Sequence, residues 1–255
     1  MKKENYHTHT TGSDGRLKPE ELIKLAIKKK FDVIAITDHY RNPPGFRKWG
    51  NEHYSQEHYD LIVNLKKKYK NKIKILVGVE FDWISKYKKW IKKEAKRRKY
   101  DLKIISIHWI RKGEKYAPIE WKEEEFEKSV KAFGGSKKVV KQYYKDLREA
   151  IKTGLFDSVG HIDIIKMWNK DNKYFSPEEK WYKKEITKTL KLISKNKMKL
   201  DLNTSGWRKT TEEQSPSLEI IREAKKLNIP LLIGTDAHKS EQLEAGLKKI
   251  KLMKI

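Results

Sequence analysis

Short apolar runs that are rich in β-branched residues recur along this chain, and amphipathic stretches separate them. Six runs lie at 31–37, 73–79, 102–107, 156–160, 198–203 and 230–234, and a further short strand is expected to carry His7 and His9. Such runs predict buried strands, and the stretches between them predict helices. Strands that alternate with helices form right-handed βα units around a parallel sheet. We therefore expect an α/β fold with seven strands.

Two parallel architectures fit this alternation. An open doubly wound sheet offers one crevice and usually carries a glycine-rich fingerprint after its first strand, which is missing from this sequence. A βα barrel collects its chemistry from the C-terminal ends of many strands. Histidines or carboxylates follow the ends of different predicted strands here, so we favour the barrel.

No low-complexity linker, composition break or internal repeat divides the 255 residues. This length suffices for one sizeable core, and we expect a single domain over residues 1–255. The longest stretch between predicted strands is an interlude at 111–152, in which Gly134 and Gly135 separate two helical patterns. The interlude is compatible with a lid over a site or with a long βα excursion.

The formal net charge of +25 is the most prominent bulk property. One interpretation is an anionic partner, such as nucleic acid, a membrane surface or a phosphorylated small molecule. The alternative is a lysine-rich solvated surface, which we favour because lysines occur in nearly every predicted helix. The sequence shows no long apolar run, no secretory signal and no cysteine for a disulfide or thiolate site. These features are typical of a cytoplasmic protein.

His7 and His9 form the first candidate metal motif. Because side chains alternate along a strand, both imidazoles leave the same face. Together with Asp14 they suit a borderline cation such as Zn²⁺, Mn²⁺ or Fe. A His-x-His pair alone also occurs at solvated strand ends, so the remaining histidines decide between the two interpretations.

Six of the eight histidines lie at predicted strand ends, a placement that scattered core or surface histidines would not show. Asp236 and His238 repeat the spacing of the first motif, and Glu80 can bridge two cations. The ligands are too many for one tetrahedral ion and suit two or three divalent ions (Zn, Mn or Fe) roughly 3.5–4 Å apart. The nine candidate ligands are His7, His9, Asp14, His39, Glu80, His108, His161, Asp236 and His238.

These motifs, in this order along nearly the whole chain, resemble the PHP (polymerase and histidinol phosphatase) family. The segments 78–83, 154–163 and 202–209 are similar to signatures of its monofunctional histidinol-phosphatase branch. The resemblance implies the PHP fold, a distorted seven-stranded βα (TIM-like) barrel with a trinuclear metal site. The chain departs from the branch at Asp14, where many members have His, and at Ser215-Pro216, where Tyr-Pro is usual.

The resemblance also distributes the ligands among three ions. It assigns the first ion to His7, His9, Glu80 and Asp236, the second to Glu80, His108 and His161, and the third to Asp14, His39 and His238. Among these ligands we assign catalytic roles to Glu80, Asp236 and His238.

The reaction that the resemblance implies is hydrolysis of L-histidinol phosphate to L-histidinol and phosphate, a step of histidine biosynthesis. Metal coordination lowers the pKa of water from about 15.7 toward 7, so a hydroxide that bridges two ions can attack the phosphorus in line. The third ion would offset the developing negative charge. Asp38 precedes a candidate ligand, and we expect it to orient His39.

Two cations are candidates for binding the substrate. Arg208 follows a strand end and can direct two N–H groups at phosphate oxygens. Lys166 follows His161 at a position where the branch often has Arg or Lys. The tryptophans at 83, 109, 168 and 207 also follow strand ends and are candidate walls for an imidazole ring.

The two histidines outside the motifs are His53 and His58. They lie five residues apart in a predicted helix, so they do not share a face. We expect both of them at the surface.

Two other functions remain open. A PHP phosphodiesterase or nuclease would give the positive charge a role, and nucleic acid is expected as a partner only in that case. A non-catalytic, metal-stabilised module is disfavoured because the ligand set is complete. The branch-like segment 203–209 favours the phosphomonoesterase, with a small phosphate ester as its substrate and no membrane partner.

Overall fold

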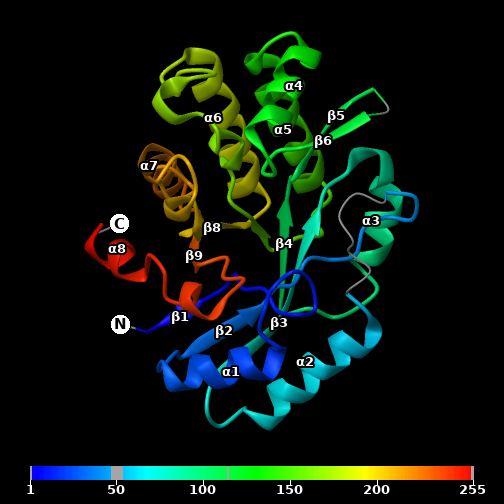
Figure 1. The fold of residues 1–255 in the computed structure, drawn as a ribbon, viewed down its shortest axis with the longest axis vertical. Helices are drawn as coiled ribbons and strands as arrows, with labels where there is room; N and C mark the ends of the chain where they lie inside the picture. The colour runs from blue at the N-terminus through cyan, green and yellow to red at the C-terminus, as the bar shows by residue number, and fades with distance from the viewer. Residues whose placement is uncertain (1, 47–53, 114, 254–255) are drawn as a thin grey trace.

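Seven parallel strands form the frame of the molecule (Figure 1). The computed structural model describes residues 2–46, 54–113 and 115–253. The strands are β1 (Glu4–Asn5), β2 (Val33–Ile36), β3 (Lys74–Asp82), β4 (Leu102–Ser106), β7 (Ser158–Val159), β8 (Lys199–Asn203) and β9 (Leu231–Gly234). They pair in this order and every pair is parallel. Each strand therefore lies beside the one that precedes it in the βα succession.

The first and last strands meet and nearly close the sheet into a ring. The Tyr6 N–H donates to the Ile233 carbonyl at 2.8 Å, and just beyond the strands the Asp236 N–H donates to the His7 carbonyl at 2.9 Å. The distorted seven-stranded βα barrel that the sequence predicts is thereby confirmed.

The helices lie around the outside of the strands (Figure 1). They are α1 (Pro19–Lys28), α2 (Gln56–Lys68), α3 (Lys88–Glu94), α4 (Glu123–Phe133), α5 (Ser136–Ile151), α6 (Lys180–Lys195), α7 (Leu218–Lys226) and α8 (Leu247–Leu252). Among the helices of the described residues, none combines the length and the apolar character needed to cross a membrane.

Helix α1 illustrates how local signals set an element. Pro19 occupies the first turn, where its missing N–H costs no hydrogen bond. The Glu21 carboxylate accepts from the Lys18 N–H at 2.9 Å, and an acid at this end also favours the helix dipole. Leu22 and Ile23 are buried, which fixes the face that the helix turns toward the barrel.

Strand β3 runs further than the predicted 73–79 and includes Glu80. Its side chains alternate, as the period of a strand requires. Val79 and Phe81 belong to the large apolar core, whereas the Glu80 side chain is 1% exposed and lies among histidines inside the ring. The extension therefore places a carboxylate at the centre of the barrel.

The interlude between β4 and β7 begins with a hairpin that the sequence pattern did not predict. Its antiparallel strands, β5 (Trp109–Lys112) and β6 (Lys115–Pro118), are short and partly charged, so they lack the apolar runs of the barrel strands. Helices α4 and α5 follow, and Gly134 separates them at φ 73°, a left-handed conformation that favours glycine. The interlude therefore consists of a hairpin and two helices, and Pro118, Glu120 and Trp121 of it line the cavity described below.

Candidate metal centre and active site

A cavity of about 490 Å³ opens at the C-terminal ends of the strands. This is the end at which βα barrels carry their chemistry. The cavity is lined by Asp14, His39, Asn42, Glu80, Asp82, His108, Trp109, Pro118, Glu120, Trp121, His161, Ser205, Arg208, Lys209, Asp236, His238 and Gln242. Seven of the nine candidate ligands are in this set, and the other two, His7 and His9, lie buried beside them.

Three groups of ligand atoms face one another at this end of the barrel. Atoms of each group lie within 4.8 Å of one another. The His7 group comprises His7, His9 and Asp236, with Glu80 beside it, and the Asp14 group comprises His9, Asp14, His39 and His238. The His161 group comprises His108, Glu120 and His161, and His39, Glu80 and His108 connect the groups. The structure therefore brings all nine candidate ligands together.

The His7 group contains polar atoms that face one another without a hydrogen bond between them. His7 Nε2 lies 3.2 Å from Glu80 Oε2, and His9 Nε2 lies 3.2 Å from Asp236 Oδ1. Within the described chain, these two nitrogens and Glu80 Oε2 are buried and have no hydrogen-bond partner. Buried polar atoms without partners are costly, and a shared cation would satisfy all of them.

The His161 group includes a carboxylate, Glu120, that was not among the predicted ligands. His161 Nε2 lies 3.3 Å from Glu80 Oε1, and His108 Nε2 lies 3.5 Å from Glu120 Oε1. Glu120 comes from the interlude, where no motif marks it. Its other oxygen pairs with Lys209.

Asp14 completes the third group from an exposed position. Its Oδ1 lies 3.3 Å from His238 Nε2, and its Oδ2 lies 3.8 Å from His39 Nε2. The Asp14 side chain is 50% exposed, whereas the His9 ring is buried and stacks on the His238 ring with centroids 4.2 Å apart. His9 therefore serves two groups, where the resemblance assigned it to one ion.

Two carboxylates outside the groups, and the backbone carbonyl of Asp236, orient three of the imidazoles. His7 Nδ1 lies 2.7 Å from Asp201 Oδ2, and His108 Nδ1 lies 2.6 Å from Asp82 Oδ1. His238 Nδ1 lies 3.0 Å from the Asp236 carbonyl oxygen. Each contact leaves Nε2 facing the centre, which is the arrangement of metal-binding histidines.

The charges of the buried groups support one another. Burial alone would raise the pKa of Glu80, but the imidazoles of His7 and His39 outweigh it and hold that pKa well below its usual range. Burial and the neighbouring imidazoles of His238 and His39 lower the pKa of His9 to about 4. Glu80 thus offers an ionised carboxylate and His9 a neutral imidazole, whereas nearby carboxylates raise the pKa values of His7, His108 and His238, so a bound cation would displace protons from these three rings.

This donor set fits borderline divalent ions. It consists of imidazole nitrogens and carboxylate oxygens, and the chain contains no cysteine. Zn²⁺, Mn²⁺ and Fe²⁺ accept such ligands. The three groups could hold two or three ions.

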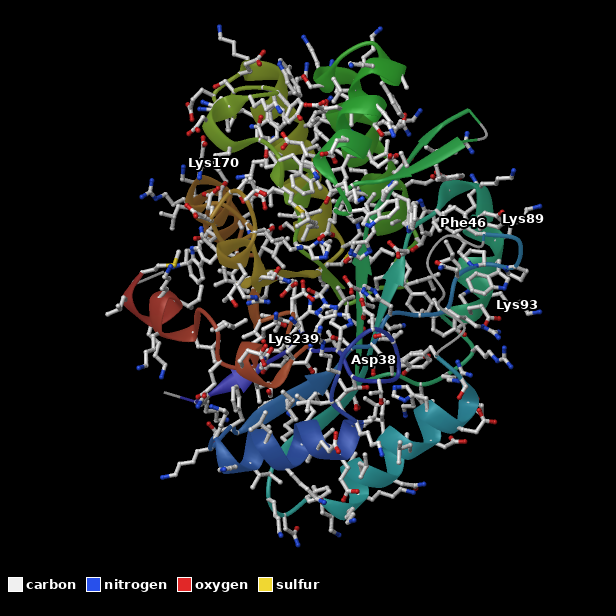
Figure 2. All side chains as sticks on the ribbon, viewed as in Figure 1. Asp38, Phe46, Lys89, Lys93, Lys170 and Lys239 are labelled. Carbon is white, nitrogen blue, oxygen red and sulfur yellow. The ribbon has the colours of Figure 1, made fainter. Side chains whose placement is uncertain are left out.

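Asp38 does not orient His39, contrary to the sequence-based expectation. Its buried carboxylate accepts from the Thr10 N–H at 2.5 Å, from Thr10 Oγ1 at 2.6 Å and from Ser13 Oγ at 2.9 Å. The fourth contact, at 2.9 Å, is with His58 Nε2. Figure 2 shows Asp38 in the interior of the molecule.

The expectation that His58 lies at the surface is also wrong. Its side chain is 9% exposed because it turns inward to Asp38. The prediction of exposure rested on the five-residue spacing of the two histidines in a helix. That spacing could not reveal Asp38, which lies in a distant segment of the chain. The other histidine in this prediction, His53, lies outside the described residues.

The two predicted substrate cations have different surroundings. Arg208 lines the cavity, and one of its terminal nitrogens donates to the Thr235 carbonyl at 2.8 Å and the Asp236 carbonyl at 3.2 Å. Lys166 is not among the lining residues; it is buried, 3.0 Å from an Asp163 oxygen and 2.9 Å from a Glu213 oxygen. The Lys166 ammonium is therefore paired with two carboxylates of the protein and does not face the cavity.

The four tryptophans that were candidate walls for the substrate have different surroundings. Trp109 lines the cavity, as does Trp121 of the interlude, which was not predicted. The Trp83 indole donates to Glu149, Trp168 donates to the Ile119 carbonyl, and the Trp207 ring lies under the Lys249 ammonium. Trp109 is the only one of the four that lines this cavity.

Comparison with known proteins gives consistent results. A family model described as PHP domain matches residues 5–205. The histidinol-phosphatase of Bacillus subtilis is 30% identical over 258 residues, which cover 94% of this chain and 95% of that protein. A crystal structure from Listeria monocytogenes, assigned as a histidinol phosphatase, superposes with a TM-score of 0.87 at 22% identity and covers 97% of this chain and 99% of that one. The Lactococcus lactis histidinol phosphate phosphatase, solved with zinc, L-histidinol and phosphate, gives 0.73 at 20% identity, covering 98% and 93%.

Proposed function

Because the chain belongs to the PHP domain family, we propose that it is a metal-dependent phosphomonoesterase that hydrolyses L-histidinol phosphate to L-histidinol and phosphate. Relatives that it matches over nearly their whole length carry the name histidinol-phosphatase. The enzyme would serve histidine biosynthesis and act in the cytoplasm, where small phosphate esters are made.

The observation that carries this proposal is the set of partnerless ligand atoms beside the cavity at the C-terminal ends of the strands. His7 Nε2, His9 Nε2 and Glu80 Oε2 converge without a hydrogen-bond partner among the described residues. The cavity of about 490 Å³ above them suits a ligand of small-molecule size.

We assign the metal ions to the three groups, with Zn, Mn or Fe as candidates. Bound ions would supply a nucleophile from water at neutral pH and offset the charge of the phosphate. Glu80 directs Oε2 at His7 and Oε1 at His161, so it would bridge two ions. Asp236 and His238 belong to the metal groups and also line the cavity, and this double placement supports their catalytic assignment.

Arg208 would bind the phosphate oxygens that do not react. Two backbone carbonyls hold one of its terminal nitrogens, and the described residues supply no hydrogen-bond acceptor for its other N–H groups. A guanidinium fixed in this way keeps a planar pair of donors for an oxyanion. Trp109 and Trp121, which also line the cavity, would flank the organic part of the substrate.

The test is phosphate release by metal-stripped protein that has been reloaded with Zn²⁺ or Mn²⁺. L-histidinol phosphate is compared with p-nitrophenyl phosphate, a dinucleotide and single-stranded DNA. We expect kcat/KM for L-histidinol phosphate to exceed the others by about a thousandfold, or about 4 kcal/mol. Arg208→Ala should abolish most of this activity, whereas the matched control Arg222→Ala, on the exposed side of α7, should not.

A preference for the dinucleotide or DNA would contradict the substrate assignment and support the phosphodiesterase alternative. The charge of +25 would then act in substrate binding, and affinity for DNA should fall steeply with salt. Lysines such as Lys89 and Lys93 of α3 extend outward from the barrel (Figure 2), as a solvated surface requires.

A further inference from the structure

We infer that His58 is a positioning residue that holds the Asp14 group of the metal centre in place through Asp38. The inference rests on the proposed metal-dependent function. It assigns a role to a helical histidine that belongs to none of the ligand motifs and lies in α2, outside the barrel strands.

Asp14 depends on its backbone for its position. Its side chain is half exposed, so packing does little to hold the carboxylate near His238. The backbone around it forms a compact turn, in which the Thr10 carbonyl accepts from the Ser13 N–H at 3.0 Å and the Gly15 N–H at 2.9 Å. Whatever fixes this turn therefore fixes Asp14.

Asp38 holds the turn in place through hydrogen bonds. Its carboxylate is completely buried and binds Thr10 through two hydrogen bonds and Ser13 through one. Ser13 Oγ lies 3.1 Å from Asp14 Oδ1 and 3.4 Å from His9 Nδ1. Ser13 has one hydroxyl proton, so its bond to Asp38 holds Ser13 itself, the residue next to Asp14 in the chain, and leaves Oγ to accept from His9 Nδ1.

His58 supplies the remaining contact of this carboxylate. Within the described chain, the other donors to the Asp38 side chain all belong to the turn, and His58 Nε2, at 2.9 Å, is the one that comes from elsewhere. Because an ionised carboxylate only accepts, Nε2 must carry a proton. The bond therefore connects the turn to helix α2.

Contacts with three residues define the position of the His58 imidazole. Its backbone N–H donates to Ser55 Oγ, the N-cap of α2, at 3.1 Å. Its ring packs edge-on against Tyr54, with centroids 5.2 Å apart. On the other side it lies against Gly12, where an added Cβ would stand 2.0 Å from His58 Cε1. His58 therefore supports the turn by contact as well as through Asp38.

Loss of the donor should loosen the turn more than the fold. A buried carboxylate that loses a partner is destabilised, and its remaining partners, Thr10 and Ser13, belong to the turn. Residues outside the ligand shell that orient metal ligands typically change affinity by about 10- to 100-fold. We expect a loss of this size in the Asp14 group and a smaller one in the His7 group, which shares His9 with it.

The experiment counts bound metal without substrate, so its outcome does not depend on the identity of the substrate. Stripped protein is equilibrated with buffered free Zn²⁺ or Mn²⁺, and bound ions are measured by inorganic mass spectrometry. Asp14→Ala serves as the reference for a damaged Asp14 group. His58→Leu should show the same reduced count as Asp14→Ala, whereas His58→Gln, which keeps a donor, should recover most of the wild-type count.

Tyr59→Phe is the matched control. It also removes one hydrogen bond from α2, the 2.7 Å bond to the Lys99 carbonyl, but lies away from Asp38. It should bind metal like the wild type. Should His58→Leu fail to fold, His58→Ala is measured with and without added imidazole, which should restore the lost ion.

Three results would overturn the inference. The first is a folded His58→Leu or His58→Ala protein that holds as many ions as the wild type. The second is a loss that neither His58→Gln nor imidazole restores, because that result indicates general damage to packing. The third is a wild-type count no higher than that of Asp14→Ala, because the Asp14 group would then hold no ion.

Discussion

His7 Nδ1 lies 2.7 Å from Asp201 Oδ2 inside the barrel, where both side chains are almost fully buried. The contact assigns Nδ1 of this imidazole to the carboxylate of β8 and directs Nε2 toward Glu80 and Asp236. Two strands that are distant in the chain, β1 and β8, thereby determine the orientation of one candidate ligand.

Replacing this carboxylate should weaken metal binding. Asp201→Asn removes the charge that makes His7 a better ligand, and we expect metal affinity to fall about 10- to 100-fold. Competition with a chromogenic chelator measures it. Asp157→Asn is the matched control, because Asp157 likewise accepts a hydrogen bond, from the Lys103 N–H at 2.7 Å, but lies outside the centre. Equal losses in both variants would refute the role of Asp201.

The guanidinium of Arg208 should be needed for its shape as well as its charge. Arg208→Lys keeps the charge but cannot present two parallel donors. We expect kcat/KM for L-histidinol phosphate to fall about 10- to 100-fold, the effect of one charge-assisted hydrogen bond. Steady-state kinetics test this beside Arg222→Lys. Activity within twofold of the wild type would show that Arg208 makes no paired contact with phosphate.

Removal of the ions should lower thermal stability. Ions that bind the folded chain at a hundred times their dissociation constant stabilise it by about 2.7 kcal/mol, so stripping should lower the Tm by about 5–10 °C for a chain of this size. Zn²⁺ or Mn²⁺ should restore the Tm in a melting assay. Ca²⁺, which prefers oxygen ligands, is the control and should not. An unchanged Tm after verified stripping would contradict a metal centre at these residues.

Glu94 should stabilise the fold at neutral pH and less in acid. Burial opposes its ionisation, but hydrogen bonds from Tyr40, Arg41 and Arg97 outweigh this and hold the pKa of Glu94 below its usual value. A lowered folded-state pKa gives stability that is present above the unfolded pKa of about 4.3 and lost as the pH falls through the folded value.

The measurement for Glu94 is urea unfolding of metal-free wild type and Glu94→Gln between pH 7 and pH 3. The wild type should be the more stable at pH 7, and the difference should shrink below about pH 4.3. Glu124→Gln, an exposed carboxylate in α4, is the control for general charge effects. A difference that stays constant across this range would count against the pKa shift.

The barrel and the ligand positions could be predicted because both follow from short-range patterns. A period of two was expected to put His7 with His9, and Asp236 with His238, on common faces of strands. Both pairs lie just beyond strands, which end at Asn5 and Gly234, and Asp236 has φ 51°, so the position at the strand end was correct but the strand conformation was not. Parallel strands then bring their C-terminal ends to one side. The positions of the nine candidate ligands at strand ends are therefore enough to predict that they lie at one end of the barrel.

The partners of those ligands could not be predicted in the same way. Asp201, Glu120 and His58 each act on a residue from a distant segment, and nothing in their own neighbourhood in the sequence signals the contact. Asp82 is the exception, since alternation from Glu80 along β3 would have placed it on the same face. Lys166 shows the converse, because its motif position suggested a substrate contact while Asp163 and Glu213 engage its charge.

The near-closure between β1 and β9 also has a consequence for synthesis. Thr8 and Ala237 form a bridge, and Asp236 faces His9 across the same seam. A nascent chain still on the ribosome carries the first two histidines long before it carries the carboxylate that completes their group. The His7 group, the most deeply buried of the three, would therefore select its metal only once translation has passed residue 236.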